Sequence, residues 1–214
     1  MKFSIEELRP IRNGMTISRD SKLGNSTKVT YFSMGKDTSI SQESYDRMTM
    51  YIGASGWGEF IIGEEPEIIK LQPDELLIVP AGTLCGMQTS NGIVYTEIIC
   101  TGKDINMNAN VKTNEVFALK NLISYEEGSI ANMDVVSTPD MKYVLMAFDD
   151  GTGLTPHRAP GNAIVFALEG KATIGYEGKD YELSEGECFR FKKNGLHSVT
   201  ANGKFKMALL LMLE

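Results

Sequence analysis

Two stretches in the second half of the chain decide the fold. Residues His157–Gly170 read HRAPGNAIVFALEG, and residues Gly186–His197 read GECFRFKKNGLH. Each combines a histidine and a glycine-containing turn with a short apolar run of the length typical of a β-strand. The chain contains only two histidines, and both lie in these stretches. Any imidazole chemistry in this protein must therefore involve this pair.

Outward from these stretches, the chain continues as short runs rich in Val, Ile, Tyr and Phe, separated by Gly, Asp, Asn and Pro. Such runs with turn residues between them predict strands. The predicted strands are Val29–Phe32, Glu59–Ile62, Glu75–Val79, Ile93–Ile99, Tyr143–Phe148, Ala163–Leu168, Ala172–Tyr176, Phe189–Phe191 and Phe205–Met212. Their regular spacing favours a sandwich or barrel.

The two halves of the chain follow the same order of runs and turns. Leu71–Glu75 aligns with Leu183–Glu187, and the same register places Cys85 on His197. Glu43 or Tyr45, depending on the gap, falls on His157. We therefore expect a duplicated domain. The expected units are an N-terminal segment (1–27), a degenerate barrel (28–102), a polar linker (103–123) and a second barrel (124–214).

The two quoted stretches resemble the two motifs of the cupin superfamily. The first of these motifs runs His-x-His, Pro, Glu and a strand ending in Leu-x-Gly, and the second runs Gly-Glu, a strand, Pro-x-Gly and His. The His-x-Ala-Pro-Gly form also resembles small bacterial cupins. The resemblance implies an all-β protein with two tandem jelly-roll barrels. Short helices are expected after the capping box Ser4–Glu7 and within Glu115–Ile123 of the linker.

The resemblance also implies a metal site, which this sequence matches only in part. His157 and His197 match two ligand positions, whereas Ala159 and Ala163 stand where a second His and a Glu belong. The expectation is one divalent transition metal, iron, manganese, nickel or zinc, on His157 and His197, completed by Asn162 or water. The ligand pocket expected around it consists of His157, Ala159, Asn162, Ala163, Val165, Arg190 and His197.

Strand alternation leaves one orientation open at this pocket. Either Arg190 with Cys188 faces the interior, where the guanidinium would bind an acidic ligand, or Phe189 and Phe191 do. Alternation predicts that Val165 faces inward together with Ala163. The first barrel has no histidine, so we interpret it as structural, with Cys85 buried and unreactive.

Composition restricts the partners. The net charge of −7 disfavours nucleic acid and anionic membranes, and no apolar run approaches the roughly 20 residues of a membrane span. Three widely spaced cysteines do not form a disulfide framework, which favours a reducing cytoplasm. Edge-strand pairing makes a homodimer the expected assembly.

Three functional hypotheses follow. The first is a bicupin that binds a small molecule, with or without a divalent metal, in its C-terminal barrel. The second is a metal-dependent dioxygenase, isomerase or lyase acting on a small polar or sugar-like substrate. The third is a non-catalytic sensor or structural barrel. The sequence leaves open whether the protein is an enzyme.

Overall fold

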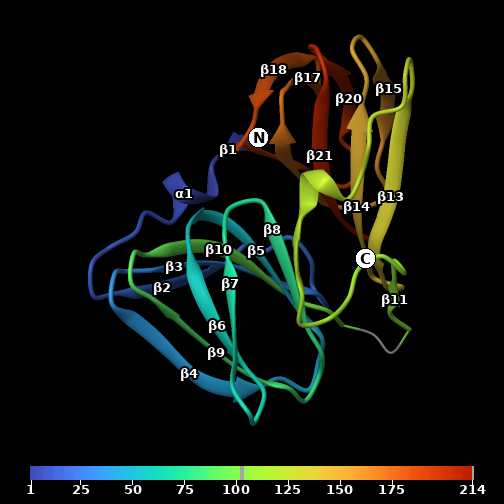
Figure 1. Cartoon of the computed structure of the whole chain (residues 1–214). Helices are drawn as coiled ribbons and strands as arrows, with labels where there is room; N and C mark the ends of the chain where they lie inside the picture. Colours follow the sequence, from blue (N-terminus) through green and yellow to red (C-terminus); the bar gives the residue numbers. More distant parts are fainter. Residues whose placement is uncertain (102–103, 214) are drawn as a thin grey trace. The chain divides into compact units, whose positions relative to one another are not determined.

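The computed structural model describes residues 1–101 and 104–213, which form two compact units. One unit contains Ile5–Thr101 and Ala109–Ala118. The other contains Met1–Ser4, 104–108 and 119–213. We call them the first and the second barrel. In Figure 1 the first is drawn mainly in blue to green and the second mainly in yellow to red.

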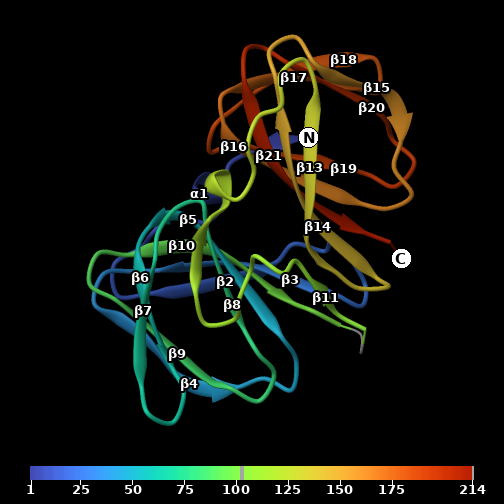
Figure 2. The same ribbon diagram turned by 45° about the vertical axis from the view of Figure 1, so that its right-hand side comes forward.

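The first barrel consists of two antiparallel sheets (Figures 1 and 2). The larger sheet has the order β12-β8-β5-β10-β3-β2, and the smaller has the order β4-β9-β6-β7. Their bounds are β2 Thr16–Asp20, β3 Lys28–Met34, β4 Thr38–Ser44, β5 Thr49–Gly56, β6 Gly58–Ile62, β7 Glu67–Leu71, β8 Glu75–Val79, β9 Leu84–Thr89, β10 Ile93–Ile99 and β12 Val116–Ala118. The helix α1 (Ile5–Leu8) packs against β5 and β10.

The second barrel repeats this plan. Its larger sheet has the order β1-β19-β16-β21-β14-β13-β11, and its smaller has the order β15-β20-β17-β18. Their bounds are β1 Lys2–Phe3, β11 Asn106–Met107, β13 Ile130–Ser137, β14 Met141–Phe148, β15 Gly153–Arg158, β16 Ala163–Glu169, β17 Lys171–Tyr176, β18 Lys179–Ser184, β19 Cys188–Phe191, β20 Leu196–Ala201 and β21 Phe205–Met212.

Both units are jelly-roll barrels, as the sequence predicts, because each closes two antiparallel sheets over its own apolar core. Tyr51, Phe60 and Tyr95 lie at the centre of the first core, and Phe189 and Phe191 lie in the second. Phe60 on β6 alternates with less buried neighbours, whereas the neighbours of Tyr51 on β5 and of Tyr95 on β10 are buried as well.

The same irregularity occurs in both barrels. A bulge in β4 lies between Ile40 and Glu43, and a bulge in β15 lies between Leu154 and His157. After the bulge in β4, Glu43 pairs with Cys85 on β9. After the bulge in β15, His157 pairs with His197 on β20. A bulge redirects the side chain that follows it, so this shared feature orients Glu43 in the first barrel and His157 in the second.

The structure corrects the expected boundaries. Part of the N-terminal segment, β2, already belongs to the first barrel, whereas β1 joins the second. Within the linker, the short helix expected in Glu115–Ile123 is present over three residues only. Val116–Ala118 forms β12 on the edge of β8, and only Leu119–Asn121 turns as a 3-10 helix, η1. The expected boundary at 102/103 and the final residue 214 lie outside the described residues.

Among the described residues, no helix has the length and apolar character needed to cross a membrane.

Candidate functional site

The structure brings the two histidines together. His157 on β15 and His197 on β20 are direct cross-strand partners, and their ring centroids lie 4.2 Å apart. His197 is buried, and its ring also packs against Phe191 at 4.3 Å. His157 remains exposed. The imidazole pair therefore sits at the edge of the barrel, with one ring inside and one in solvent.

Backbone contacts determine which ring nitrogen each histidine can offer to a ligand. Nδ1 of His157 lies 2.8 Å from the Thr155 carbonyl, and Nδ1 of His197 lies 2.9 Å from the Gly195 carbonyl. A carbonyl oxygen can only accept, so Nδ1–H donates in both bonds and Nε2 carries the lone pair. Burial lowers the pKa of His197; the Gly195 carbonyl opposes this shift, and His157 adds to it.

The interior beside these imidazoles is filled with apolar side chains. Ala163 and Val165 face into the core, which confirms the predicted alternation. Phe189 and Phe191 occupy the same core, their rings 4.9 Å apart, and each is at most 1% exposed. The side chains of the second barrel therefore fill the space that a ligand would need beside His197.

Arg190 corrects the predicted pocket. Because Phe189 and Phe191 face inward, Arg190 between them faces away from the interior. It borders a shallow outer hollow together with Asn162, whose Oδ1 accepts a hydrogen bond from the Lys193 amide. Ala159 is half-buried, and its carbonyl accepts from the Asn194 amide. None of these three residues shares the barrel interior with His197.

The donor set of this region does not fit a cupin-type metal centre. A catalytic zinc or iron site uses three or more protein ligands. In the described part of the chain, no three His, Cys, Asp or Glu side chains are placed to hold one ion together. The alanines at 159 and 163 are the direct cause, because they replace two ligand positions with methyl groups.

The first barrel carries different functional groups at the positions that correspond to His157 and His197. Glu43 on β4 pairs directly with Cys85 on β9, as His157 pairs with His197. The structure thereby decides between Glu43 and Tyr45 as the counterpart of His157. The barrel interpreted as structural carries a carboxylate and a thiol where the other barrel carries two imidazoles.

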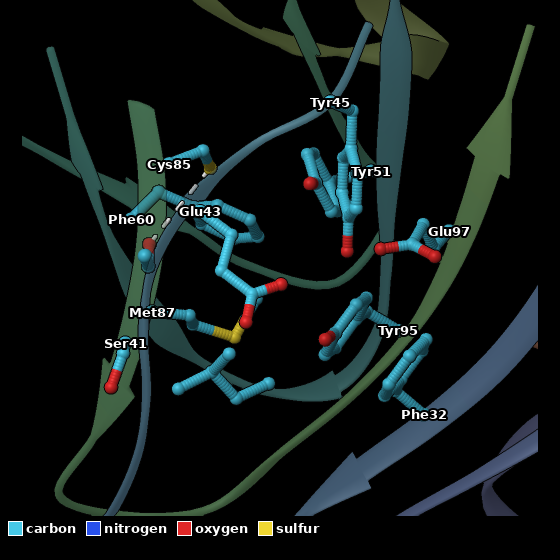
Figure 3. A pocket seen from close by; sticks show the side chains of 12 residues that line it. Phe32, Ser41, Glu43, Tyr45, Tyr51, Phe60, Cys85, Met87, Tyr95 and Glu97 are labelled. Carbon is cyan, nitrogen blue, oxygen red and sulfur yellow. Dashed lines mark hydrogen bonds between the residues drawn. The ribbon is translucent and has the colours of Figure 1, made fainter. Parts of the chain in front are cut away.

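This pair lies beside a half-enclosed cavity of about 90 Å³ inside the first barrel (Figure 3). Two carboxyl groups (Glu43 and Glu97), three phenols and one thiol line it. Its walls also include two phenylalanine rings and a methionine. No Lys, Arg or His is among the lining residues. Its carboxyl, phenol and thiol side chains are Glu43, Tyr45, Tyr51, Cys85, Tyr95 and Glu97.

Glu97 is the unusual member of this set. Its side chain comes from the middle of β10 and is 5% exposed, yet it lines the cavity. Among the residues that the structure describes, none forms a hydrogen bond or ion pair with its carboxylate. Burial raises the pKa of Glu97 to about 7, and the more distant charge of Lys28 opposes the shift only in part.

The neighbouring phenols and the thiol stay protonated at neutral pH. Burial raises the pKa of Cys85 to about 11, although a hydrogen bond from Tyr51 opposes the shift. Burial also raises the pKa values of Tyr45, Tyr51 and Tyr95. Glu97 is therefore a buried group that changes charge near neutrality beside phenol and thiol groups that keep their protons.

Sequence reasoning missed Glu97, although a signal was present. The run Ile93–Ile99 contains one carboxylate in a strand that is otherwise apolar or uncharged. A charged residue in a buried strand is expensive unless it has a function or a partner.

The comparisons with known proteins agree with this architecture. The family described as Cupin domain matches residues 144–213. This part of the chain is a cupin domain. It contains both stretches that carry the sequence resemblance, including the two histidines. A comparison with curated proteins gives no match in sequence.

Solved structures extend the cupin likeness to the first barrel. A Cupin 2 conserved barrel domain protein from Leptotrichia buccalis is 24% identical and has a TM-score of 0.87. The match covers 99% of this chain and 96% of that one. Salicylate 1,2-dioxygenase from Pseudaminobacter salicylatoxidans is 10% identical, with a TM-score of 0.64 over 87% of this chain and 70% of its own. At such identities the likeness establishes the fold alone.

Proposed function

We propose that this cupin binds a small molecule in the cavity of its first barrel. The observation that carries the proposal is Glu97, a buried carboxyl group that faces a cavity and has no hydrogen-bond partner among the described residues. Leaving such a group unpaired costs free energy, which a ligand that pairs with it would recover. Binding without catalysis is sufficient to account for the site.

The dimensions of the cavity restrict the ligand. A volume of about 90 Å³ corresponds to roughly six water-sized positions, so only a ligand of a few non-hydrogen atoms fits entirely inside. Tyr45 and Glu43 are exposed at the mouth, so a larger molecule would extend past them into solvent.

The proposal is tested with a panel of small cationic, neutral and anionic probes, followed by NMR on the full chain. We expect at least one probe to shift the Met87 methyl signal in the first barrel. The Met207 methyl, in the core of the second barrel, is the internal control. If no probe of any charge shifts Met87, the cavity is not a ligand site.

A divalent ion on His157 and His197, completed by water, is the second candidate. It is favoured by the 4.2 Å ring separation and by two Nε2 atoms that carry lone pairs. Purified protein should then retain iron, manganese, nickel or zinc near one equivalent, and His157→Ala should lose it. Metal content well below one equivalent, or unchanged in the variant, rejects this candidate.

Dioxygenase, isomerase or lyase activity would require that metal, so it depends on the same measurement. Association of two copies through edge strands remains a prediction, which light scattering of the purified chain would test.

A further inference from the structure

The cavity of the first barrel is lined by acidic side chains and by no basic ones. Glu43 enters from β4 at the mouth and Glu97 from β10 in the buried part, so acidic groups come from two different sheets. Figure 3 shows both carboxylates directed into the same space. Since two carboxyl groups and no basic side chain line the cavity, the charges there disfavour an anionic ligand.

Aromatic rings form the remaining polarisable wall. Phe32 stacks on Tyr95 with ring centroids 5.0 Å apart and an interplanar angle of 4°. Tyr51 packs against Phe60 at 4.7 Å. These rings are fixed by packing against one another before a ligand binds. Binding therefore costs little conformational entropy in these side chains. Ring faces attract cations, and several of them around one site favour an alkylated ammonium.

We propose that the cavity of the first barrel binds a small organic cation, an ammonium group bearing methyl or short alkyl substituents, between Glu43, Glu97 and the tyrosine rings. This inference rests on the proposed function, because it names the class of ligand for the same cavity. The cation would supply a positive charge that no residue lining the cavity provides, and its alkyl groups would contact Tyr51 and Tyr95.

The charges around Glu97 predict how binding depends on pH. The titratable groups around Glu97 come from five strands and from the segment after β4. They are Lys28 on β3, Glu43 on β4, Tyr45 after β4, Tyr51 on β5, Cys85 on β9 and Tyr95 on β10. The raised pKa values of the phenols and the thiol keep them neutral between pH 6 and 8. With the pKa of Glu97 at about 7, its ionisation dominates in this window.

A cation binds the ionised form of Glu97 better than the protonated form. Its affinity should therefore rise as the pH rises through 7 and fall as the pH drops below it. Between pH 6 and 8 the ionised fraction changes by about tenfold, and the apparent affinity should follow. Tetramethylammonium does not titrate, so any pH dependence of its binding belongs to the protein.

The experiment measures tetramethylammonium binding to the full chain by NMR and calorimetry at pH 6 and pH 8, at constant ionic strength. tert-Butanol serves as a neutral probe of similar shape and pivalate as an anionic one. We expect tetramethylammonium to shift Met87 and to bind about tenfold more tightly at pH 8. Glu97→Gln should weaken binding at pH 8 by at least about tenfold and abolish the pH dependence.

Two further variants keep the test decisive. Glu43→Gln alters an exposed side chain and should weaken tetramethylammonium binding without unfolding the barrel. Glu64→Gln, in the exposed turn after β6, is the matched control and should change nothing. If Glu97→Gln does not fold, the pH dependence of the native chain and the Glu43→Gln result decide the matter.

The outcomes separate this inference from the proposed function. If tert-butanol or pivalate shifts Met87 while tetramethylammonium does not, the cavity binds ligands but the cation assignment is overturned. Binding of tetramethylammonium that is equal at pH 6 and 8 and unaffected by Glu43→Gln also overturns it. If none of the three probes affects the cavity, both proposals fail.

Discussion

At the scale of single residues, Glu97 makes the stability of the first barrel depend on pH. Its pKa is raised from 4.5 to about 7 in the folded chain. A raised carboxyl pKa stabilises the fold below the unfolded value, and this contribution is lost as the pH rises through the folded value. The empty first barrel should therefore be less stable at pH 8 than at pH 5.

Glu97→Gln removes this penalty. We expect the variant to exceed the native chain in unfolding free energy by up to about 3 kcal/mol at pH 8, and by little at pH 5. Trp57, the only tryptophan, lies in the first barrel, so its fluorescence follows this unfolding in urea. A pH-independent difference between the two chains would show that Glu97 ionises normally.

Cys85 should be a slow nucleophile despite its place beside the cavity. With its pKa raised to about 11, it carries very little thiolate at pH 7.5. Alkylation by iodoacetamide should then be at least about 100-fold slower than for an ordinary free thiol, and should accelerate with each pH unit up to about 10. Peptide mass spectrometry separates Cys85 from the two buried cysteines, and rapid labelling at neutral pH would contradict the assignment.

At the scale of elements, Gly161 determines how the turn before β16 meets β21. A Cβ atom at this position would lie 1.4 Å from the carbonyl oxygen of Met212, so the backbones approach too closely for any side chain. The glycine in the His-x-Ala-Pro-Gly stretch is therefore required by packing. It does not need a ligand to explain it.

Gly161→Ala should destabilise the second barrel by about 2–3 kcal/mol, because the backbone itself has to move. The Met212 methyl signal in a urea titration would report this loss. Gly58→Ala is the matched control, since its Cβ would meet the flexible Ile93 side chain at 3.2 Å. The loss in unfolding free energy caused by Gly58→Ala, measured by Trp57 fluorescence in urea, should be clearly smaller. Equal losses would refute the packing argument.

The linker shows why element prediction from sequence has a limit. Glu115–Ile123 has local features of a short helix, but Val116–Ala118 pairs with Glu75–Leu77 and becomes β12. The free edge of β8 satisfies the backbone groups of this segment, and that long-range pairing outweighs local propensity. No property of residues 115–123 alone contains this information.

At the scale of the whole molecule, segments near a boundary join units that their sequence position does not predict. β1 belongs to the second barrel, where Lys2 and Phe3 pair with Phe189 and Cys188. The Arg190 amide also donates to the Met1 carbonyl at 3.0 Å. The first residues of the chain therefore cover an edge of the second barrel's larger sheet.

Deleting Met1–Ser4 should expose this edge. We expect the Arg190 amide to exchange with deuterium about tenfold faster or more, because it loses its acceptor. The Asn114 amide donates to Ile78 within the first barrel and is the control that should keep its rate. An unchanged rate at Arg190 would mean that β1 does not protect β19 in solution.

The order of apolar runs and turns predicts two duplicated barrels, and the resemblance to the cupin motifs predicts that His157 and His197 meet. The alignment of the two halves places Cys85 on His197 but leaves Glu43 and Tyr45 open as the counterpart of His157. Only the packing in three dimensions reveals the cavity beside Glu97. Phe189 and Phe191 occupy the core of the second barrel beside His197, whereas the first barrel leaves space beside Glu97. The empty volume inside a barrel depends on how side chains from several strands pack against one another. The alternation along a strand predicts which face of the sheet a side chain lies on, but not how closely it packs against the others.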